Sequence, residues 1–171
     1  MTLIYQKYLE LVLAEAQKSL NESCTPVAAC LVDRDGELIA VARSQARSEE
    51  INRQGSIVHA ELSLLLDNQS AFSKGHSVTL YTSLEPCHMC MGACIVSRVS
   101  TVVWATDDYW GGATRLYERW RDYLRMRTPE LIRTPYPDLQ RQGADLWVAH
   151  LNRVDKQEYI ERILKWQPGI E

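Results

Sequence analysis

Residues 80–90 read LYTSLEPCHMC, and this stretch carries the strongest structural signal in the chain. The apolar and β-branched residues at 78–82 predict a strand, which the following Ser-Leu-Glu-Pro sequence ends, because proline disfavours a continuing strand ladder. Residues 87–97 then predict a helix that starts just after Pro86. An extended segment that leads directly into a helix is the local order expected in an α/β domain.

Strands and helices alternate on both sides of this stretch. The turn sequence Asp33-Arg34-Asp35-Gly36 joins two apolar segments and predicts a hairpin. The predicted strands are 27–32, 38–42, 78–82, 101–105 and 145–151, the predicted helices are 2–20, 59–66, 87–97, 113–126 and 155–166, and the proline-containing segment 128–138 is expected to be irregular. This alternation predicts a layered α/β domain with helices on both faces of one sheet.

Length and composition indicate one globular domain. The chain has 171 residues, of which 46% are hydrophobic and 24% charged, so disordered and collagen-like classes are excluded. No segment reaches the ~18 consecutive apolar residues of a membrane span, and residues 1–20 lack the apolar block of a signal peptide. We therefore expect a cytoplasmic protein with no membrane partner, organised as a single domain over 1–171.

The cysteine count and the charge narrow the function classes. Five cysteines are an odd number, so thiols, metal ligands or catalytic groups are favoured over a complete disulfide framework. The net charge of −3 gives no general attraction to long polyanions such as nucleic acids. A nucleic-acid function would therefore depend on a local basic patch.

Two short motifs at predicted helix starts point to a metal site. The first is His59-Ala60-Glu61, and the second is Cys87-His88-Met89-Cys90. Cysteines at positions i and i+3 share one face of a helix turn, so both sulfurs can hold one ion, and the imidazole supplies a third ligand. This mixed sulfur and nitrogen set suits Zn²⁺ and not the oxygen-preferring Mg²⁺.

Glu61 adds an acid–base group to the predicted zinc site. With three protein ligands, the fourth position of zinc holds water, whose pKa falls from about 15.7 towards roughly 7. The Glu61 carboxylate lies two residues after His59, close to the metal but turned away from ligation. It can move a proton from this water to a substrate atom, which suits hydrolytic attack on an electrophilic carbon.

A structural zinc site and a metal-free coincidence are the alternatives. A closed structural site needs a fourth ligand, for which the candidates are Cys94, His88, Cys30, His76 and His150. Cys94 lies about 6 Å further along the helix than Cys90, too far for a bond of ~2.3 Å to the same ion. His88 points about 100° away from Cys87 around the helix.

The two motifs together resemble the signature of the zinc-dependent cytidine deaminase-like superfamily, His-x-Glu followed by Pro-Cys-x-x-Cys. The surrounding residues 80–87, Met91-Gly92-Ala93 and Ser97-Arg98 are similar to the branch that contains guanine deaminases, fungal-type cytosine deaminases and bacterial tRNA-adenosine deaminases. The resemblance extends from the hairpin near Val27 to about Asp108 and is weak beyond it.

The resemblance implies a three-layer α/β/α sandwich with a five-stranded mixed central sheet. It also implies Zn²⁺ ligation by His59, Cys87 and Cys90, and proton transfer by Glu61, first to a ring nitrogen and then to the departing ammonia. The backbone N–H groups of Ala60 and Cys87 would face the tetrahedral centre. Because the family commonly forms dimers or larger assemblies, a homodimer is expected.

The substrate contacts are less well defined by the sequence. Many members of the family place an asparagine after the second strand, whereas here Ser44 is nearest to that place, with Asn52 and Gln54 as substitutes in a long loop. After the fourth strand, Asp108 or Asp107 is a candidate for hydrogen bonding to a base, and Trp110 or Tyr109 for stacking on it. The alternative for this segment is a solvated turn with an aromatic residue in the core.

The C-terminal part, 106–171, is expected to be a variable, substrate-capping part of the domain. The arginines of 113–127 spread around the predicted helix, so a solvated face is favoured over a phosphate site. Buried positions are expected for Cys24, Cys30 and Cys94, and packing roles for Trp147 and Trp166.

The sequence therefore predicts a zinc-dependent hydrolytic deaminase of an aminated nucleobase or nucleoside, of guanine, cytosine or adenosine type. Zinc-bound hydroxide would attack the amino-bearing ring carbon, and ammonia would leave. A tRNA-specific adenosine deaminase is the first alternative, less favoured because the chain is acidic and has no continuous basic stripe. A non-catalytic zinc-stabilised binding module is the second alternative.

Overall fold

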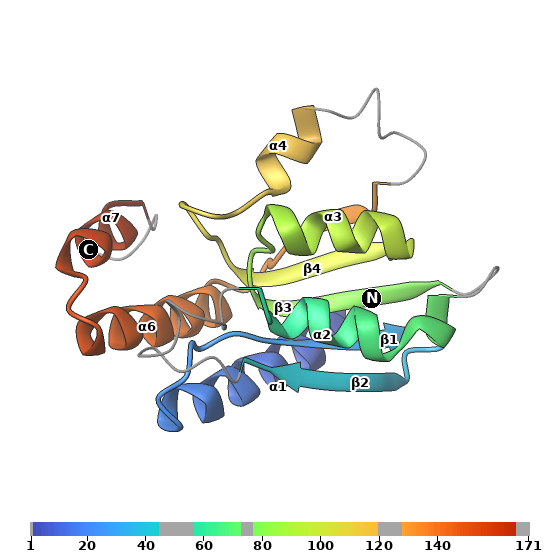
Figure 1. Cartoon of the computed structure of the whole chain (residues 1–171), viewed down its shortest axis with the longest axis horizontal. Helices are drawn as coiled ribbons and strands as arrows, with labels where there is room; N and C mark the ends of the chain where they lie inside the picture. Colours follow the sequence, from blue (N-terminus) through green and yellow to red (C-terminus); the bar gives the residue numbers. More distant parts are fainter. Residues whose placement is uncertain (1, 45–56, 73–76, 120–127, 167–171) are drawn as a thin grey trace.

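The computed structural model describes residues 2–44, 57–72, 77–119 and 128–166 (Figure 1). The strands are β1 (Ala28–Asp33), β2 (Leu38–Arg43), β3 (Val78–Leu84), β4 (Thr101–Thr106) and β5 (Glu130–Arg133). The helices are α1 (Thr2–Asn21), α2 (Ala60–Asp67), the short 3-10 helix η1 (Gln69–Phe72), α3 (His88–Ser97), α4 (Thr114–Arg119), α6 (Pro137–Arg153) and α7 (Gln157–Trp166).

The five strands form one mixed sheet in the order β2-β1-β3-β4-β5. β1 pairs antiparallel with both β2 and β3, whereas β3, β4 and β5 run parallel to one another. The expected hairpin is confirmed: its turn is closed by hydrogen bonds around Asp33, and Gly36 adopts a φ of 86°. The positive φ at Gly36 explains the glycine, because other residues rarely adopt it.

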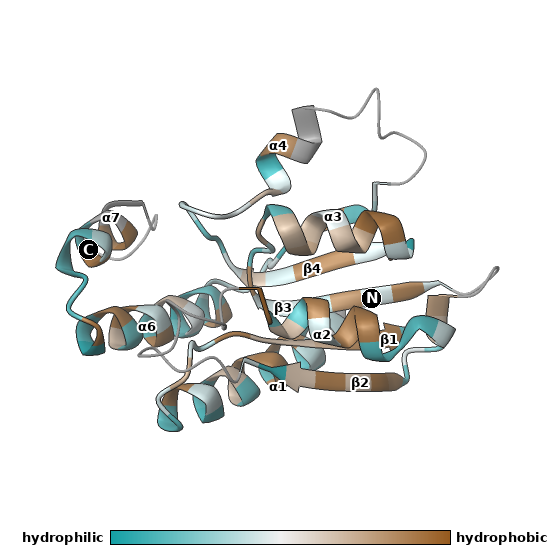
Figure 2. Ribbon diagram, in the orientation of Figure 1, coloured by the Kyte–Doolittle hydropathy of each residue, from teal (hydrophilic) through white to brown (hydrophobic). Residues whose placement is uncertain are grey.

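Helices cover both faces of this sheet (Figure 1). On one face, α1 and α6 pack over Ala28, Cys30 and Val32 of β1. On the other face, α2 and α3 pack over the alternate residues Ala29 and Leu31, as the two-residue period of a strand requires. Figure 2 shows the resulting apolar interior, with hydrophobic residues along β3 and β4. The predicted three-layer α/β/α sandwich is therefore confirmed.

The position predicted for the fifth strand is wrong. Residues 145–151 lie within α6, and the fifth strand is β5, in the segment expected to be irregular. In α6 the buried positions Leu139, Gly143, Leu146 and His150 recur every three or four residues, which is the helical period. A window of seven residues was too short to reveal this period. β5 is four residues long and depends on its pairing with β4, a partner distant in sequence.

Parts of two other predictions lie outside the described residues. Of the predicted helix 113–126, α4 covers Thr114–Arg119, and 120–127 are not described. Residues 45–56, which include the candidate substrate contacts Asn52 and Gln54, are also outside the described residues. The predicted burial of Cys24, Cys30 and Cys94 is confirmed.

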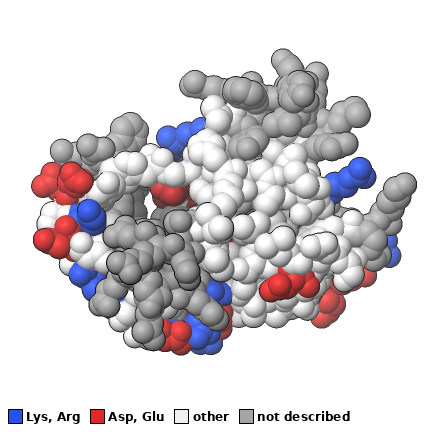
Figure 3. Space-filling model, in the orientation of Figure 1, with Lys and Arg blue, Asp and Glu red and all other residues white. Residues whose placement is uncertain are grey.

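The described surface is mixed in charge. Figure 3 shows side chains of both signs around the edge of one face and mostly uncharged residues over its centre. Val96 on α3 is the most exposed of the large hydrophobic residues, at 80%. No described helix combines the length and the apolar character needed to cross a membrane.

Gly143 allows α6 to pack closely against β4, and its replacement by alanine tests this contact. A Cβ atom at Gly143 would collide with the Thr106 hydroxyl and lie 3.3 Å from a methyl carbon of Leu13. We expect Gly143→Ala to lower the free energy of unfolding by about 1–3 kcal/mol in urea denaturation. At an unconstrained helical position the same change would raise stability by about 1 kcal/mol.

A second substitution identifies the cause of this loss. Thr106→Ala removes the colliding hydroxyl, so in a double-mutant cycle it should cost less in the Gly143→Ala protein than in the parent. A Gly143→Ala protein as stable as the parent would contradict the packing argument.

Candidate active site

The two predicted motifs lie at the starts of two helices on the same face of the sheet. His59 precedes α2 with φ −79° and ψ 152°, and Cys87 precedes α3 with φ −71° and ψ 173°. Each is an N-cap: the carbonyl of His59 accepts the N–H of Ser63, and that of Cys87 accepts the N–H of Met91. The helices therefore begin one residue after these side chains, close to the predicted boundaries.

His59, Cys87 and Cys90 come together in a single cluster. The His59 Nδ1 atom lies 3.6 Å from the Cys87 Sγ atom and 3.4 Å from the Cys90 Sγ atom, and all three atoms lie within 4.8 Å of one another. Tetrahedral zinc with ordinary Zn–S and Zn–N bonds places such atoms about 3.5 Å apart. The residues present therefore fit a zinc ion.

The thiols of the cluster are unequal. Hydrogen bonding from Cys90, together with that from the His59 ring, lowers the pKa of the Cys87 thiol to about 3. The contact with Cys87 and burial raise the pKa of Cys90. Cys87 is thus held as a thiolate, the form that binds metal.

The cluster has three ligands, as expected for a site with an open coordination position. Among the described residues, no further histidine, cysteine or carboxylate joins it as a fourth ligand. Cys94 is completely buried on α3 in the apolar core, and His88 is exposed. A closed structural site would require a fourth protein ligand.

Glu61 lies beside the cluster, in the first turn of α2. Its side chain is 2% exposed, and its Oε2 atom has no hydrogen-bond partner among the described residues. Burial raises the pKa of this carboxyl group. An unpartnered buried oxygen is costly unless a bound group supplies its partner. Glu61 is therefore suited to bind a solvent or substrate atom that lies next to the metal position.

A cavity of about 460 Å³ opens beside His59 and Cys87. Its size falls in the usual range for small-molecule sites, about 300–1,000 Å³. Most of its wall comes from the chain after β4. The residues that line it are His59, Leu84, Cys87, Thr106, Asp107, Asp108, Tyr109, Trp110, Gly111, Ala144, Trp147, His150, Leu151, Val154, Lys156, Tyr159 and Ile163.

Asp107 and Asp108 both line the cavity, and both have structural partners. Asp107 accepts hydrogen bonds from the Trp104 indole at 2.9 Å and from Arg133 Nε at 3.0 Å. The Oδ1 atom of Asp108 accepts the backbone N–H groups of Trp110 and Gly111 at 2.9 and 3.0 Å. The Asp108 side chain therefore shapes the loop after β4, in addition to facing the cavity.

Trp110 lines the cavity and contacts α7. The residue is 45% exposed, and its ring is tilted by 48° against that of Tyr159, with the ring centroids 4.1 Å apart. The adjacent Tyr109 ring lies under the Arg115 guanidinium, 5.2 Å from ring centroid to Cζ. The first contact connects the loop after β4 with α7, and the second connects it with α4.

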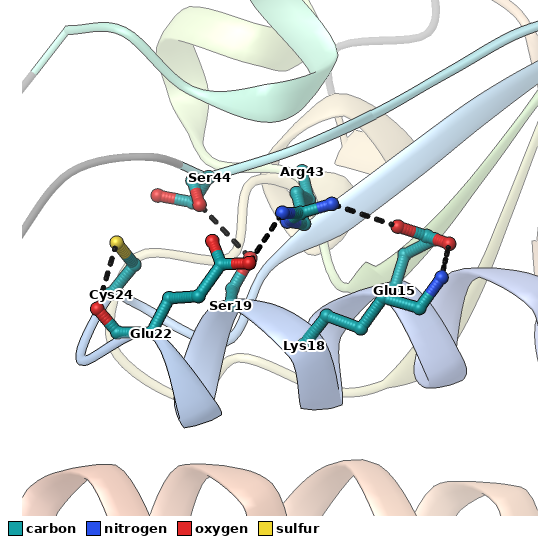
Figure 4. A network of polar contacts seen from close by, with 7 residues as sticks. All are labelled: Glu15, Lys18, Ser19, Glu22, Cys24, Arg43 and Ser44. Carbon is teal, nitrogen blue, oxygen red and sulfur yellow. Dashed lines mark hydrogen bonds and ion pairs between the residues drawn. The ribbon is translucent and has the colours of Figure 1, made fainter.

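Ser44 and Ala60 are buried, and neither is among the described residues that line this cavity. Ser44 follows β2, where its carbonyl accepts the Ser19 hydroxyl at 2.9 Å. Arg43 fixes the same strand end to α1 by ion pairs with Glu22 at 2.6 Å and Glu15 at 3.4 Å (Figure 4).

From the sequence, 106–171 was expected to cap the substrate, but the residues of α6 and α7 that line the cavity were not singled out. Trp147 was expected to be a packing anchor and His150 was considered only as a metal ligand, yet both line the cavity wall, together with Tyr159 of α7. Because 145–151 was predicted to be a strand, the helical spacing of Trp147 and His150 could not be used to find this wall. Trp147 and His150 share a face only when the segment is read as a helix.

Comparison with known proteins agrees with this geometry. Residues 3–106 match the family model "Cytidine and deoxycytidylate deaminase zinc-binding region". A tRNA-specific adenosine deaminase of Streptococcus pyogenes is 34% identical over 116 residues, which are 65% of this chain and 69% of that protein. The cytosine deaminase of Candida albicans is 28% identical over 134 residues, 77% of this chain and 87% of that protein.

A solved structure from a study of tRNA:A34 deaminases superposes with a TM-score of 0.64 at 23% identity, covering 82% of this chain and 99% of that one, which supports the fold. Other Streptococcus pyogenes relatives are matched over 64% of their length, so the chain spans about two thirds of these proteins.

A His-Cys-Cys cluster with a buried carboxylate, set in this fold, defines a zinc-dependent deaminase. The chain belongs to the cytidine and deoxycytidylate deaminase family, whose members hydrolyse C–N bonds.

Zinc content tests the ligand set. We expect His59→Ala, Cys87→Ser and Cys90→Ser each to lose stoichiometric zinc, measured by elemental analysis of the purified protein, because two remaining ligands hold the ion poorly. Cys94→Ala is the matched control on α3 and should retain zinc. Zinc loss in the control, or its retention in all three ligand variants, would contradict the assignment.

Proposed function

We propose that this chain is a hydrolytic deaminase that uses Zn²⁺ held by His59, Cys87 and Cys90, with Glu61 as the proton-transfer group. The observation that carries the proposal is the buried, unpartnered Glu61 Oε2 atom beside the three-ligand cluster, two of whose ligands line a cavity of small-molecule size. A purely structural site gives no reason to bury a carboxylate with one oxygen left unpartnered.

The reaction converts an amino-bearing ring carbon into a carbonyl. Water supplies the oxygen of the new C–O bond, the C–N bond to the amino group breaks, and ammonia leaves. When bound, zinc would ionise this water near neutral pH. Glu61 takes one water proton and delivers it to the ring nitrogen next to the reacting carbon. It then moves the remaining hydroxyl proton to the amino group, which leaves as neutral ammonia.

For the substrate, we favour a free nucleobase or nucleoside. Two carboxylates, Asp107 and Asp108, face the cavity, and among the described lining residues Lys156 is the only one with a positive side chain. Such a lining disfavours a phosphate backbone. Residues 107–166 supply most of the wall, so we assign 106–171 the role of a substrate cap within the single domain, with Asp108 and Trp110 as substrate contacts.

The second candidate is a tRNA-specific adenosine deaminase. Two relatives that are 34% and 37% identical to this chain are named tRNA-specific adenosine deaminase. These names favour the second candidate over a free-base enzyme. Their matches cover 116 and 109 residues of this chain. In this reading, the adenine ring of a flipped nucleotide would occupy the cavity.

The catalytic role is tested by Glu61→Gln, which keeps the size of the side chain and removes its ability to transfer protons. We expect ammonia release to fall by about 10²–10⁴-fold or more, with zinc content unchanged. Glu130→Gln makes the same charge change at an exposed position on β5 and should leave turnover intact. Undiminished turnover in Glu61→Gln would rule out this role.

Substrate class is tested with free bases, nucleosides and a tRNA anticodon stem-loop, each assayed for ammonia release at low and high salt. We expect turnover of a free base or nucleoside with little salt dependence, because an uncharged substrate releases no counterions. Conversion of adenosine to inosine in the stem-loop, strongly weakened by salt and without turnover of small substrates, would establish the second candidate instead.

A further inference from the structure

The α6 wall of the cavity contains two polar aromatic side chains that the proposed chemistry does not use. Trp147 and His150 are three residues apart on α6 and therefore share a helix face, and both line the cavity. Their rings meet edge to face, with centroids 5.5 Å apart and an interplanar angle of 87°. The two side chains thus form one continuous patch.

Both side chains have a buried polar atom without a partner. The Nε1 atom of Trp147 and the Nδ1 atom of His150 have no hydrogen-bond partner among the described residues. His150 is only 4% exposed. Buried donors and acceptors in native proteins are nearly always paired, since an unpaired one loses its hydration without compensation. Two adjacent exceptions on a cavity wall indicate that the partner is a ligand in the cavity.

The chemistry of the pair defines what it binds. An indole N–H is a donor only. Burial lowers the pKa of His150, and the nearby positive charge of Arg153 lowers it further, so the imidazole is neutral and has one donor and one acceptor nitrogen. The patch therefore offers a donor beside an acceptor and carries no net charge, which disfavours phosphate or carboxylate as the ligand.

We infer that Trp147 and His150 form a specificity subsite for a lactam edge, a ring N–H next to a carbonyl, on the base to be deaminated. The indole N–H donates to the carbonyl oxygen, and an imidazole nitrogen accepts the ring N–H. Rotation about the Cβ–Cγ bond of His150, a broad torsion, turns that nitrogen towards the cavity. This inference rests on the proposed function, because it places the amino-bearing carbon at Glu61.

The test compares the binding of two free bases that differ only in whether they carry the lactam edge. Calorimetry uses the zinc-loaded full chain carrying Glu61→Gln, so that substrates persist. Cytosine is compared with 4-aminopyrimidine, and guanine with 2-aminopurine, each second member lacking the lactam. In at least one pair we expect the lactam base to bind about tenfold more tightly or better, the effect of one or two buried hydrogen bonds.

Two variants connect this preference to the subsite. Trp147→Phe removes the N–H and keeps an aromatic ring, and His150→Phe removes both nitrogens. Each should raise the Kd of the lactam base about tenfold and leave that of its counterpart unchanged. The two variants report separately, so a folding failure in one leaves the other decisive. The control, Trp104→Phe, removes the indole N–H of a residue that does not line the cavity. That N–H is bonded to Asp107, which keeps its contact with Arg133, so the variant should preserve the preference.

The outcomes separate this subsite from the proposed reaction. The subsite is overturned if no base binds, if lactam and non-lactam bases bind equally, or if the variants weaken both members of a pair alike. A lactam preference lost in Trp147→Phe supports the subsite even if the wild-type chain releases no ammonia from any base, a result that would refute only the reaction. Turnover with unaltered Kd values would refute only the subsite.

Discussion

The position of the site depends on the buried carboxylate of Glu85, directly after β3 and two residues before Cys87. Its side chain accepts the backbone N–H of Asp108 at 3.0 Å, the N–H of Thr114 at 3.1 Å and the Thr114 hydroxyl. These hydrogen bonds compensate for the desolvation that raises its pKa. Gly112, which bridges to Cys87, passes so close to Glu85 that a Cβ would collide with the carboxylate. The buried carboxylate of Glu85 therefore fixes the start of α3, which carries the cysteine ligands, relative to the loop that lines the cavity.

The metal cluster is formed at some cost to the stability of the helices. N-cap positions favour Ser, Thr, Asp or Asn, whose side chains bond the first free N–H groups and contribute about 1 kcal/mol each. Here the N-caps are His59 and Cys87, and neither side chain makes a capping hydrogen bond. Both instead face each other across the site. The positive ends of the two helix dipoles favour thiolate there, so the same helix starts that lose caps gain affinity for a cation-bound sulfur.

The sequence predicted the part of the molecule in which local pattern and chemistry coincide. The hairpin, the helices beginning at His59 and Cys87, and their meeting in one cluster follow from short-range periodicity and ligand spacing. The C-terminal third was harder, because β5 has only four residues and exists through its pairing with β4, and because residues 145–151 were read apart from the helix that contains them. The α6 and α7 residues of the cavity wall were missed for the same reason. Trp147 and His150 lie together on the cavity wall because of the helical period and the close contact of Gly143 with Thr106.

In our proposal, chemistry and selectivity occupy different parts of the chain. The family match ends at residue 106, and it contains every ligand of the cluster together with Glu61. Most of the residues that line the cavity follow that point, on the loop after β4 and on α6 and α7. If the proposed subsite is right, substitutions on α6 would change which ring edge is bound without moving the metal ligands, since α2 and α3 pack on the opposite face of the sheet. The family match thus supports the reaction, whereas in our proposal the choice of base depends on side chains that lie beyond residue 106.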